Sequence, residues 1–228
     1  EYVWATSWGV STRLIGALIM AHSDDKGLVL PPNLAPIQVV MIPIFNNEEE
    51  YKKINEILKD ISKKLDDRKI TYKIDDRKNN KPGWKFAEYE LKGVPIRLAI
   101  GPKDLENNSI EIVRRDTLSK EICDINIIDN KISKYLIEIQ KNIYKKANDF
   151  KTENSHTPTN YEDFKNTIKN KGGFIYAHWD GTSETEEKIK KETKATIRCI
   201  PINIEKTPGK CIYSGKKSNQ MVVFSKSY

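Results

Sequence analysis

Residues 37–74 read IQVVMIPIFNNEEEYKKINEILKDISKKLDDRKITYKI and hold two apolar runs on either side of a lysine-rich segment. The first run, residues 37–44, is rich in β-branched side chains and predicts a buried strand. Residues 48–65 place isoleucine and leucine at helical spacing, and their three opening glutamates suit a helix N-terminus. Residues 70–74 predict a second, short strand. A strand, a helix and a strand in succession indicate an α/β domain.

The same alternation continues downstream of this stretch. Residues 84–91 predict a helix that ends before Gly93, a glycine in the position typical of a helix C-terminus. The remaining elements expected here are strands at residues 96–100 and 110–114, joined by a turn, and a long helix at residues 132–150. We therefore expect an α/β domain with a mixed sheet over residues 36–153.

A polar stretch at residues 155–159 marks the start of a further region. The elements expected beyond it are a helix at 161–169, a strand at 174–178, a helix at 184–191, a strand at 196–201 and a hairpin at 211–224. This order of elements indicates a small α+β domain over residues 154–228.

The N-terminal region has a different character. Residues 1–7 predict a strand, Trp8 and Gly9 a turn, and the apolar residues that follow a helix. Residues 22–36 are loop-like, with two consecutive prolines that favour an extended connection. Residues 1–35 are therefore expected to form a strand–helix unit and a linker. Because the chain begins without Met inside this unit, a fragment of a longer protein is the simplest explanation.

Composition restricts the class of protein. The chain has 228 residues, of which 38% are hydrophobic and 31% charged, as in soluble globular domains. No apolar run is long enough to span a bilayer, and the N-terminus does not resemble a signal peptide. The net charge of +7 favours a polyanionic partner, although a solvated lysine surface would give the same value. Three widely spaced cysteines form no CxxC pair, which favours a reducing, cytoplasmic compartment.

Few residues stand out as chemical groups on spacing alone. Asp24 and Asp25 beside His22 have the types of a metal or acid–base site, but adjacent carboxylates in a glycine-bounded turn are more often solvated. His156 lies in a polar linker and His178 at the end of an expected strand, so both are expected to be structural.

Residues 6–13, TSWGVSTR, are more informative. A strand is expected to run into a glycine turn and then a helix, with Arg13 in its first turn. Gly9 allows a ligand to approach the backbone closely, and the guanidinium of Arg13 matches phosphate oxygens. The alternative is a buried arginine that pairs with a carboxylate.

Several ordered segments resemble the prolyl-tRNA synthetase family, in its archaeal and eukaryote-like form. Residues 6–20 resemble motif 3 of class II aminoacyl-tRNA synthetases, and residues 28–40, LVLPPNLAPIQVV, resemble the connection to the anticodon-binding domain. Further matching segments are residues 83–86 (GWKF), Glu88, and residues 90–95 (ELKGVP), 100–105 (IGPKDL), 195–196 (AT), 198–201 (RCIP) and 224–228 (FSKSY). The resemblance implies the end of an antiparallel-sheet catalytic domain, an α/β anticodon-binding domain and a small α+β terminal domain.

The resemblance also implies roles at the N-terminus. Ser7, Trp8 and Gly9 would form part of a proline pocket, while Ser11 and Arg13 would face ATP. Arg13 would hold the phosphates while the proline carboxylate attacks the α-phosphorus. Mg²⁺, positioning and charge neutralisation would then supply most of the barrier reduction.

In the middle domain, the resemblance implies that five residues bind the anticodon of tRNA(Pro): Phe86, Glu90, Arg97, Lys103 and Asp104. The residue types are suitable, because an aromatic ring stacks with an unpaired base, carboxylates accept from guanine, and cations contact base acceptors or phosphates.

The chain departs from the family at the zinc site of its terminal domain. The four cysteine positions of zinc-bearing relatives correspond here to Asp180, Thr185, Cys211 and Ser214. One thiolate with a carboxylate and two hydroxyls is a poor zinc site, so we expect no zinc. As in the family, the carboxylate of Tyr228 is expected to lie near the active site.

The favoured interpretation is a proline–tRNA ligase that uses ATP and Mg²⁺, forms a homodimer and is not bound to a membrane. Motifs 1 and 2 are not in these residues, so the chain by itself is not expected to activate proline. The alternative is a non-catalytic tRNA-binding module with the same anticodon-binding fold. A structural protein that binds no RNA would instead bury Phe86 and Glu90.

Overall fold

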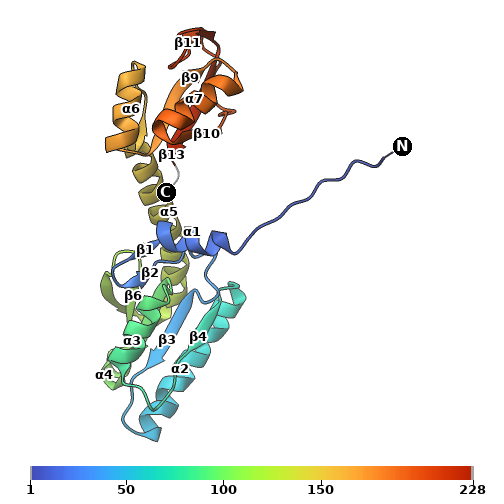
Figure 1. The fold of residues 1–228 in the computed structure, drawn as a ribbon. Coiled ribbons are helices and arrows are strands. Elements are labelled where there is room, and N and C mark those ends of the chain that lie inside the picture. The colour runs from blue at the N-terminus through green and yellow to red at the C-terminus, as the bar shows by residue number, and fades with distance from the viewer. Residues whose placement is uncertain (1, 227–228) are drawn as a thin grey trace. The chain divides into compact units, whose positions relative to one another are not determined.

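The computed structural model describes residues 2–226 of the chain. These residues fold into two compact units that divide between Lys145 and Lys146, within the long helix α5 (Ile128–Glu153) (Figure 1). The first unit therefore holds most of the expected middle domain, and the second holds the expected terminal domain.

A five-stranded mixed sheet forms the centre of the first unit. The strand order is β4 (Tyr72–Ile74), β3 (Val39–Pro43), β5 (Ile96–Ile100), β6 (Ser109–Arg114) and β7 (Lys120–Asp124). β3 pairs in parallel with both β4 and β5, whereas β5, β6 and β7 pair antiparallel. The α/β prediction with a mixed sheet is confirmed.

The central strand β3 is buried on both faces, which explains its continuous apolar sequence. Val39 and Met41 pack with α2 (Glu48–Asp67) and α5, whereas Val40 and Ile42 pack against α3 (Pro82–Leu91). Burial of each such side chain contributes about 1.5–3 kcal/mol to folding. The alternation along a single strand thus places helices on both sides of the sheet.

The helix α2 begins and ends close to the predicted residues. Asn47 caps its N-terminus, where the side-chain oxygen accepts from the backbone N–H of Glu50 at 2.9 Å. Its buried face holds the residues whose spacing predicted it: Ile54, Leu58, Ile61 and Leu65.

The turn expected between β5 and β6 is instead the short helix α4 (Pro102–Glu106), which Pro102 can begin without loss of a hydrogen bond. The strand β7 was not predicted, because its sequence KEICD does not alternate polar and apolar residues; its Ile122 is exposed. A 3-10 turn, η1 (Ile125–Ile127), follows β7.

The strand expected at residues 1–7 is wrong as far as the structure describes these residues. Residues 2–11 form no helix or strand, and their side chains are exposed. A strand needs a neighbour with which to exchange backbone hydrogen bonds, and within residues 2–226 none pairs with this segment. The helix α1 (Arg13–Ala21) does form, although none of its side chains is buried.

A hairpin of β1 (Ser23–Asp24) and β2 (Gly27–Leu28) follows α1 in the segment expected to be a loop. It packs closely against the end of α3, where a Cβ atom on Gly93 would lie 2.6 Å from the backbone oxygen of Leu28. Gly93 has a φ of +72°, so the predicted glycine terminus of α3 is confirmed. The backbone N–H of Leu30 donates to the carbonyl of Gly93 at 3.2 Å.

The second unit contains a four-stranded sheet in the order β10 (Ala195–Cys199), β13 (Gln220–Lys226), β9 (Phe174–Trp179) and β8 (Ser155–His156). The helices α6 (Tyr161–Asn170) and α7 (Ser183–Thr193) supply Phe164 and Ile189 to its core. The rings of Phe164 and Phe224 meet edge to face at 5.2 Å between centroids.

The hairpin expected at residues 211–224 is only partly correct. A small hairpin pairs β11 (Gly209–Lys210) with β12 (Lys217–Ser218), whereas β13 joins the main sheet between β9 and β10. The apolar residues of β13 are buried there, which the small hairpin could not achieve.

Within residues 2–226, every helix is either too short or too polar to cross a membrane.

Candidate nucleic-acid interface

Three charged side chains from neighbouring strands lie on the face of the central sheet that α3 covers in part. Arg97 on β5 lies opposite Val113, and Glu111 on β6 lies opposite Ile122. Lys120 on β7 is also paired with Val113. Since side chains two residues apart share a face, Arg97, Glu111 and Lys120 form a diagonal row of alternating charge.

Phe86 on α3 adds an aromatic ring to this row. The guanidinium carbon of Arg97 lies 3.7 Å from the centroid of the Phe86 ring, a stacked cation–π contact. Nη1 of Arg97 donates to Oε1 of Glu111 at 2.9 Å, and Lys120 forms an ion pair with the other carboxylate oxygen. The structure therefore joins two of the five expected anticodon-binding residues directly.

The ionisation of Glu111 follows from these contacts. Burial alone would raise the pKa of its carboxyl group. The hydrogen bond from Lys120 and the charge and hydrogen bond of Arg97 outweigh burial, so the pKa lies below its usual value. Glu111 is therefore a carboxylate at neutral pH.

Glu90 lies one helical turn beyond Phe86 and is half-buried beside a small cavity. The cavity is lined by Glu90, Arg97 and Arg115, together with Tyr89, Val94, Val113 and Leu118. Nε of Arg115 donates to the backbone carbonyl of Glu90 at 2.9 Å. Arg97 and Glu90 thus line the same small cavity.

Lys103 and Asp104 lie on α4, which follows the opposite end of β5 from Arg97. Lys103 is exposed. Oδ2 of Asp104 accepts from the backbone N–H of Gly101 at 2.8 Å and so caps α4. These two residues form a second location, separate from the row that contains Arg97.

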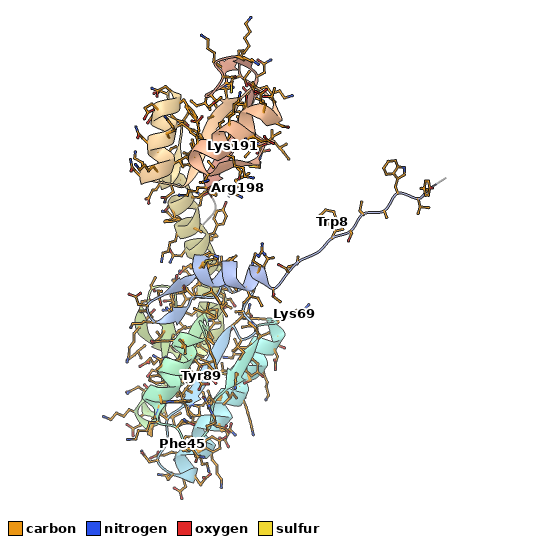
Figure 2. All side chains as sticks on the ribbon, viewed as in Figure 1. Trp8, Phe45, Lys69, Tyr89, Lys191 and Arg198 are labelled. Carbon is orange, nitrogen blue, oxygen red and sulfur yellow. The ribbon has the colours of Figure 1, made fainter. Side chains whose placement is uncertain are left out.

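The residues expected to bind proline and ATP are all exposed. Trp8, whose side chain is 94% exposed, lies on the extended segment before α1 (Figure 2). Ser7, Gly9 and Ser11 belong to the same segment, and Arg13 is the first residue of α1. All five residues are therefore open to solvent in this chain.

The four positions expected to correspond to a zinc site do come together in the second unit. Oδ2 of Asp180 accepts from the hydroxyls of Thr185 at 2.9 Å and Ser214 at 2.6 Å. The backbone N–H of Ser214 lies 3.5 Å from Sγ of the buried Cys211. Oδ1 of Asp180 also accepts from the hydroxyl of Thr182 at 2.8 Å.

Hydrogen bonds therefore join the residues at these four positions. Burial alone would raise the pKa of Asp180, but the hydrogen bonds from Ser214, Thr182 and Thr185 together outweigh it and hold the pKa well below its usual range. Within residues 2–226, no group of three or more His, Cys, Asp or Glu side chains is arranged to hold a metal ion. The absence of zinc stays a prediction.

The remaining residues considered in the sequence have other environments. Asp24 is exposed, as expected, but it lies on β1 and pairs with Arg115 through both carboxylate oxygens, at 2.6 and 2.7 Å. The imidazole of His178 packs against Gly209. Tyr228 lies outside the described residues.

Glu111, Lys120 and Arg115 were not predicted as members of this surface. A local signal exists for Glu111, which lies in a short run that alternates polar and apolar residues, whereas Lys120 lies in β7, whose sequence has no such alternation. Arg115 had no such signal, since its partner Asp24 is 91 residues away in the sequence.

Each of the two units contains a match to a known protein family. A family model described as "Anticodon binding domain" matches residues 38–135, and one described as "Prolyl-tRNA synthetase, C-terminal" matches residues 161–228. These matches fall within the regions 36–153 and 154–228 that we expected to be separate domains.

The chain is also similar over its whole length to curated proteins named proline–tRNA ligase. The identities are 60% for the protein of Porphyromonas gingivalis, 59% for that of Parabacteroides distasonis and 54% for that of Christiangramia forsetii. In each case all of this chain is covered, but only 46% of the relative. The chain thus spans about half the length of the relatives it matches.

Proposed function

Because this chain belongs to the prolyl-tRNA synthetase family, we propose that it is the tRNA-binding part of a proline–tRNA ligase. In this proposal the first unit binds the anticodon loop of tRNA(Pro) through the surface around Phe86. The reaction of the whole protein would be the ATP-dependent activation of proline and its transfer to the tRNA.

The observation that carries the proposal is the stacked pair of Phe86 and Arg97 beside Glu90. Proteins recognise unpaired RNA bases by stacking them on aromatic rings or guanidinium planes and by hydrogen bonds to their edges. Phe86 and Arg97 provide the flat surface, and Glu90 provides an acceptor next to it. The net charge of +7 favours approach of the phosphate backbone.

The test is binding of an anticodon stem-loop of tRNA(Pro) to this chain, by fluorescence anisotropy at one fixed salt concentration. Phe86→Leu keeps the apolar volume but removes the stacking face, and should weaken binding by roughly 5- to 150-fold, the value of one base–aromatic stack. Tyr144→Ala removes an aromatic side chain that is 71% exposed on α5, and should leave affinity unchanged.

A stem-loop with a substituted anticodon should bind more weakly to the wild-type chain than the tRNA(Pro) sequence does. Equal affinity for both stem-loops, together with no effect of Phe86→Leu, would contradict the proposed function.

The second part of the proposal concerns the N-terminal residues. Ser7, Trp8 and Gly9 would contact proline, and Ser11 and Arg13 would contact ATP, with Mg²⁺ neutralising phosphate charge. The apolar side chains of α1 support this location beside further protein, because Leu14, Ile15, Ile19 and Met20 are between 45% and 69% exposed. Exposed apolar patches of this kind commonly mark interaction surfaces.

In a longer protein that carries this chain, Arg13→Ala should lower proline-dependent ATP–pyrophosphate exchange by about 10²-fold, the typical effect of removing one preorganised charge-stabilising group. Anticodon stem-loop binding should stay unchanged. A non-catalytic tRNA-binding module would show no exchange, whether it carries Arg13 or Arg13→Ala. A homodimer, a cytoplasmic location and a role of Tyr228 near the active site belong to the same proposal.

A further inference from the structure

The row of charges beside Phe86 contains an acidic residue at its centre, where an RNA-binding surface would ordinarily be basic. Resting on the proposed RNA-binding function, we propose that Glu111 is a positioning residue that holds the guanidinium of Arg97 flat over the Phe86 ring for base recognition. Lys120 holds Glu111 in turn. Glu111 acts through Arg97 and does not contact RNA itself.

The contacts of Glu111 support this role. One carboxylate oxygen accepts from Nη1 of Arg97 at 2.9 Å, and the other pairs with Lys120. Both oxygens are therefore occupied from the protein side. The side chain of Glu111 is 17% exposed and that of Arg97 is 12% exposed, so water competes weakly for this bond.

The position of Arg97 depends on few contacts. Its Nε is buried, and within residues 2–226 it has no hydrogen-bond partner. The Phe86 ring attracts the guanidinium from one side but does not determine its rotation in the plane. Because an arginine side chain has several rotatable bonds, loss of the Glu111 bond would release it into many orientations. Glu111 is thus the group that determines the direction of the remaining N–H donors.

A positioning role and simple electrostatics predict opposite changes in RNA affinity when Glu111 is replaced by glutamine. If Glu111 were only an acidic group near RNA, its neutralisation in Glu111→Gln would strengthen binding, because it removes repulsion of phosphate. If Glu111 positions Arg97, the same substitution weakens binding. We expect affinity to fall by roughly tenfold, which is within the loss caused by removing one base–aromatic stack.

The experiment measures binding of the anticodon stem-loop of tRNA(Pro) to this chain at one fixed salt concentration. The matched control is Glu121→Gln on β7, which makes the same chemical change on the opposite face of the sheet. It should leave affinity unchanged or slightly higher. Glu111→Asp keeps the charge but is one methylene shorter, and should weaken binding about as much as Glu111→Gln because the carboxylate no longer reaches Arg97.

A double-mutant cycle separates positioning from a general effect on folding. In the Arg97→Ala background, Glu111→Gln should cause no further loss, since a positioning residue has no effect once the group it positions is gone. In the wild-type background, the side-chain Nε–H NMR signal of Arg97 should lose its ring-current shift when Glu111 is replaced.

The outcomes distinguish this inference from the proposed function. Wild-type or tighter affinity of both Glu111 variants, with weaker binding by Arg97→Ala, would overturn the positioning role and leave the RNA-binding function intact. Additive losses in the cycle would also overturn it. If Phe86→Leu and Arg97→Ala both bind as the wild type does, the proposed function fails, and the role of Glu111 fails with it.

Discussion

At the scale of single residues, Arg115 shows how the hairpin after α1 is held. The residue is 3% exposed, and its guanidinium donates to the carbonyl of Glu90 and to both carboxylate oxygens of Asp24. The hydrogen bonds from Arg115 hold the pKa of Asp24 at about 2. A buried guanidinium is costly without a partner, so Asp24 contributes to stability although its own side chain is 36% exposed.

Asp24→Asn should therefore destabilise the first unit by about 1–2 kcal/mol, less than for a fully buried pair because Asp24 is partly solvated. The control is Asp25→Asn, its exposed neighbour, which should have no measurable effect. The measurement is urea unfolding at neutral pH. Equal stability of the two variants would show that the ion pair contributes nothing.

The same ion pair predicts a pH dependence. The pKa of Asp24 is lower in the folded than in the unfolded chain, so the stability it provides is fully present above the unfolded value of about 3.9. It is lost as the pH falls from there through about 2. The difference in unfolding free energy between the wild type and Asp24→Asn should accordingly shrink over this range.

At the scale of elements, the end of α3 determines how closely the hairpin of β1 and β2 approaches. Gly93 combines a φ of +72° with backbone atoms of Leu28 at distances that exclude a side chain. Gly83, inside the same helix, has open space around it. A side chain is therefore excluded at Gly93, just after the helix, and tolerated at Gly83.

Gly93→Ala should destabilise the first unit by more than about 1 kcal/mol, because it adds both backbone strain and a steric clash. Gly83→Ala should instead stabilise it by about 0.5–1 kcal/mol, since alanine is the better helix former. Thermal unfolding of the two variants checks this difference in sign. Similar midpoints for both would contradict the close packing at Gly93.

The order of the elements in the first unit followed from local patterns. The strand β3 has a continuous apolar run and the helix α2 has apolar residues at helical spacing, so residues 39–67 were predicted closely. β7 was missed because an edge strand with exposed Ile122 carries little hydrophobic pattern, and the strand expected before α1 was wrong because strand formation depends on a pairing partner.

At the scale of the whole molecule, each unit has its own hydrophobic core, one around β3 and α2 and the other around Phe164 and Phe224. In the second unit, Asp180 connects the start of α7 to the turn at Cys211 and Ser214 through hydrogen bonds. These are the positions that the resemblance leads us to expect at the zinc-binding cysteines of zinc-bearing relatives. We expect hydrogen bonding and packing to stabilise this unit without a metal.

Addition of zinc or of a chelator should therefore leave the thermal unfolding midpoint of the chain unchanged. Asp180→Asn should cost about 1 kcal/mol or more of stability. Because each kcal/mol shifts the midpoint of a small domain by roughly 4–8 °C, the second unit should unfold at a correspondingly lower temperature. Differential scanning calorimetry checks both statements. A higher midpoint with stoichiometric zinc would contradict the prediction.

The sequence by itself determined the α/β character of the first unit, the boundaries of its main helix and the resemblance to one family, because helical and strand periodicities and short motifs are local properties. Only the tertiary structure decided that Phe86, Arg97, Glu111 and Lys120 form one surface, that Asp24 pairs with Arg115, and that Asp180 joins Ser214. These contacts depend on strand register and on the return of distant segments, and no pattern within a few residues records where the chain returns.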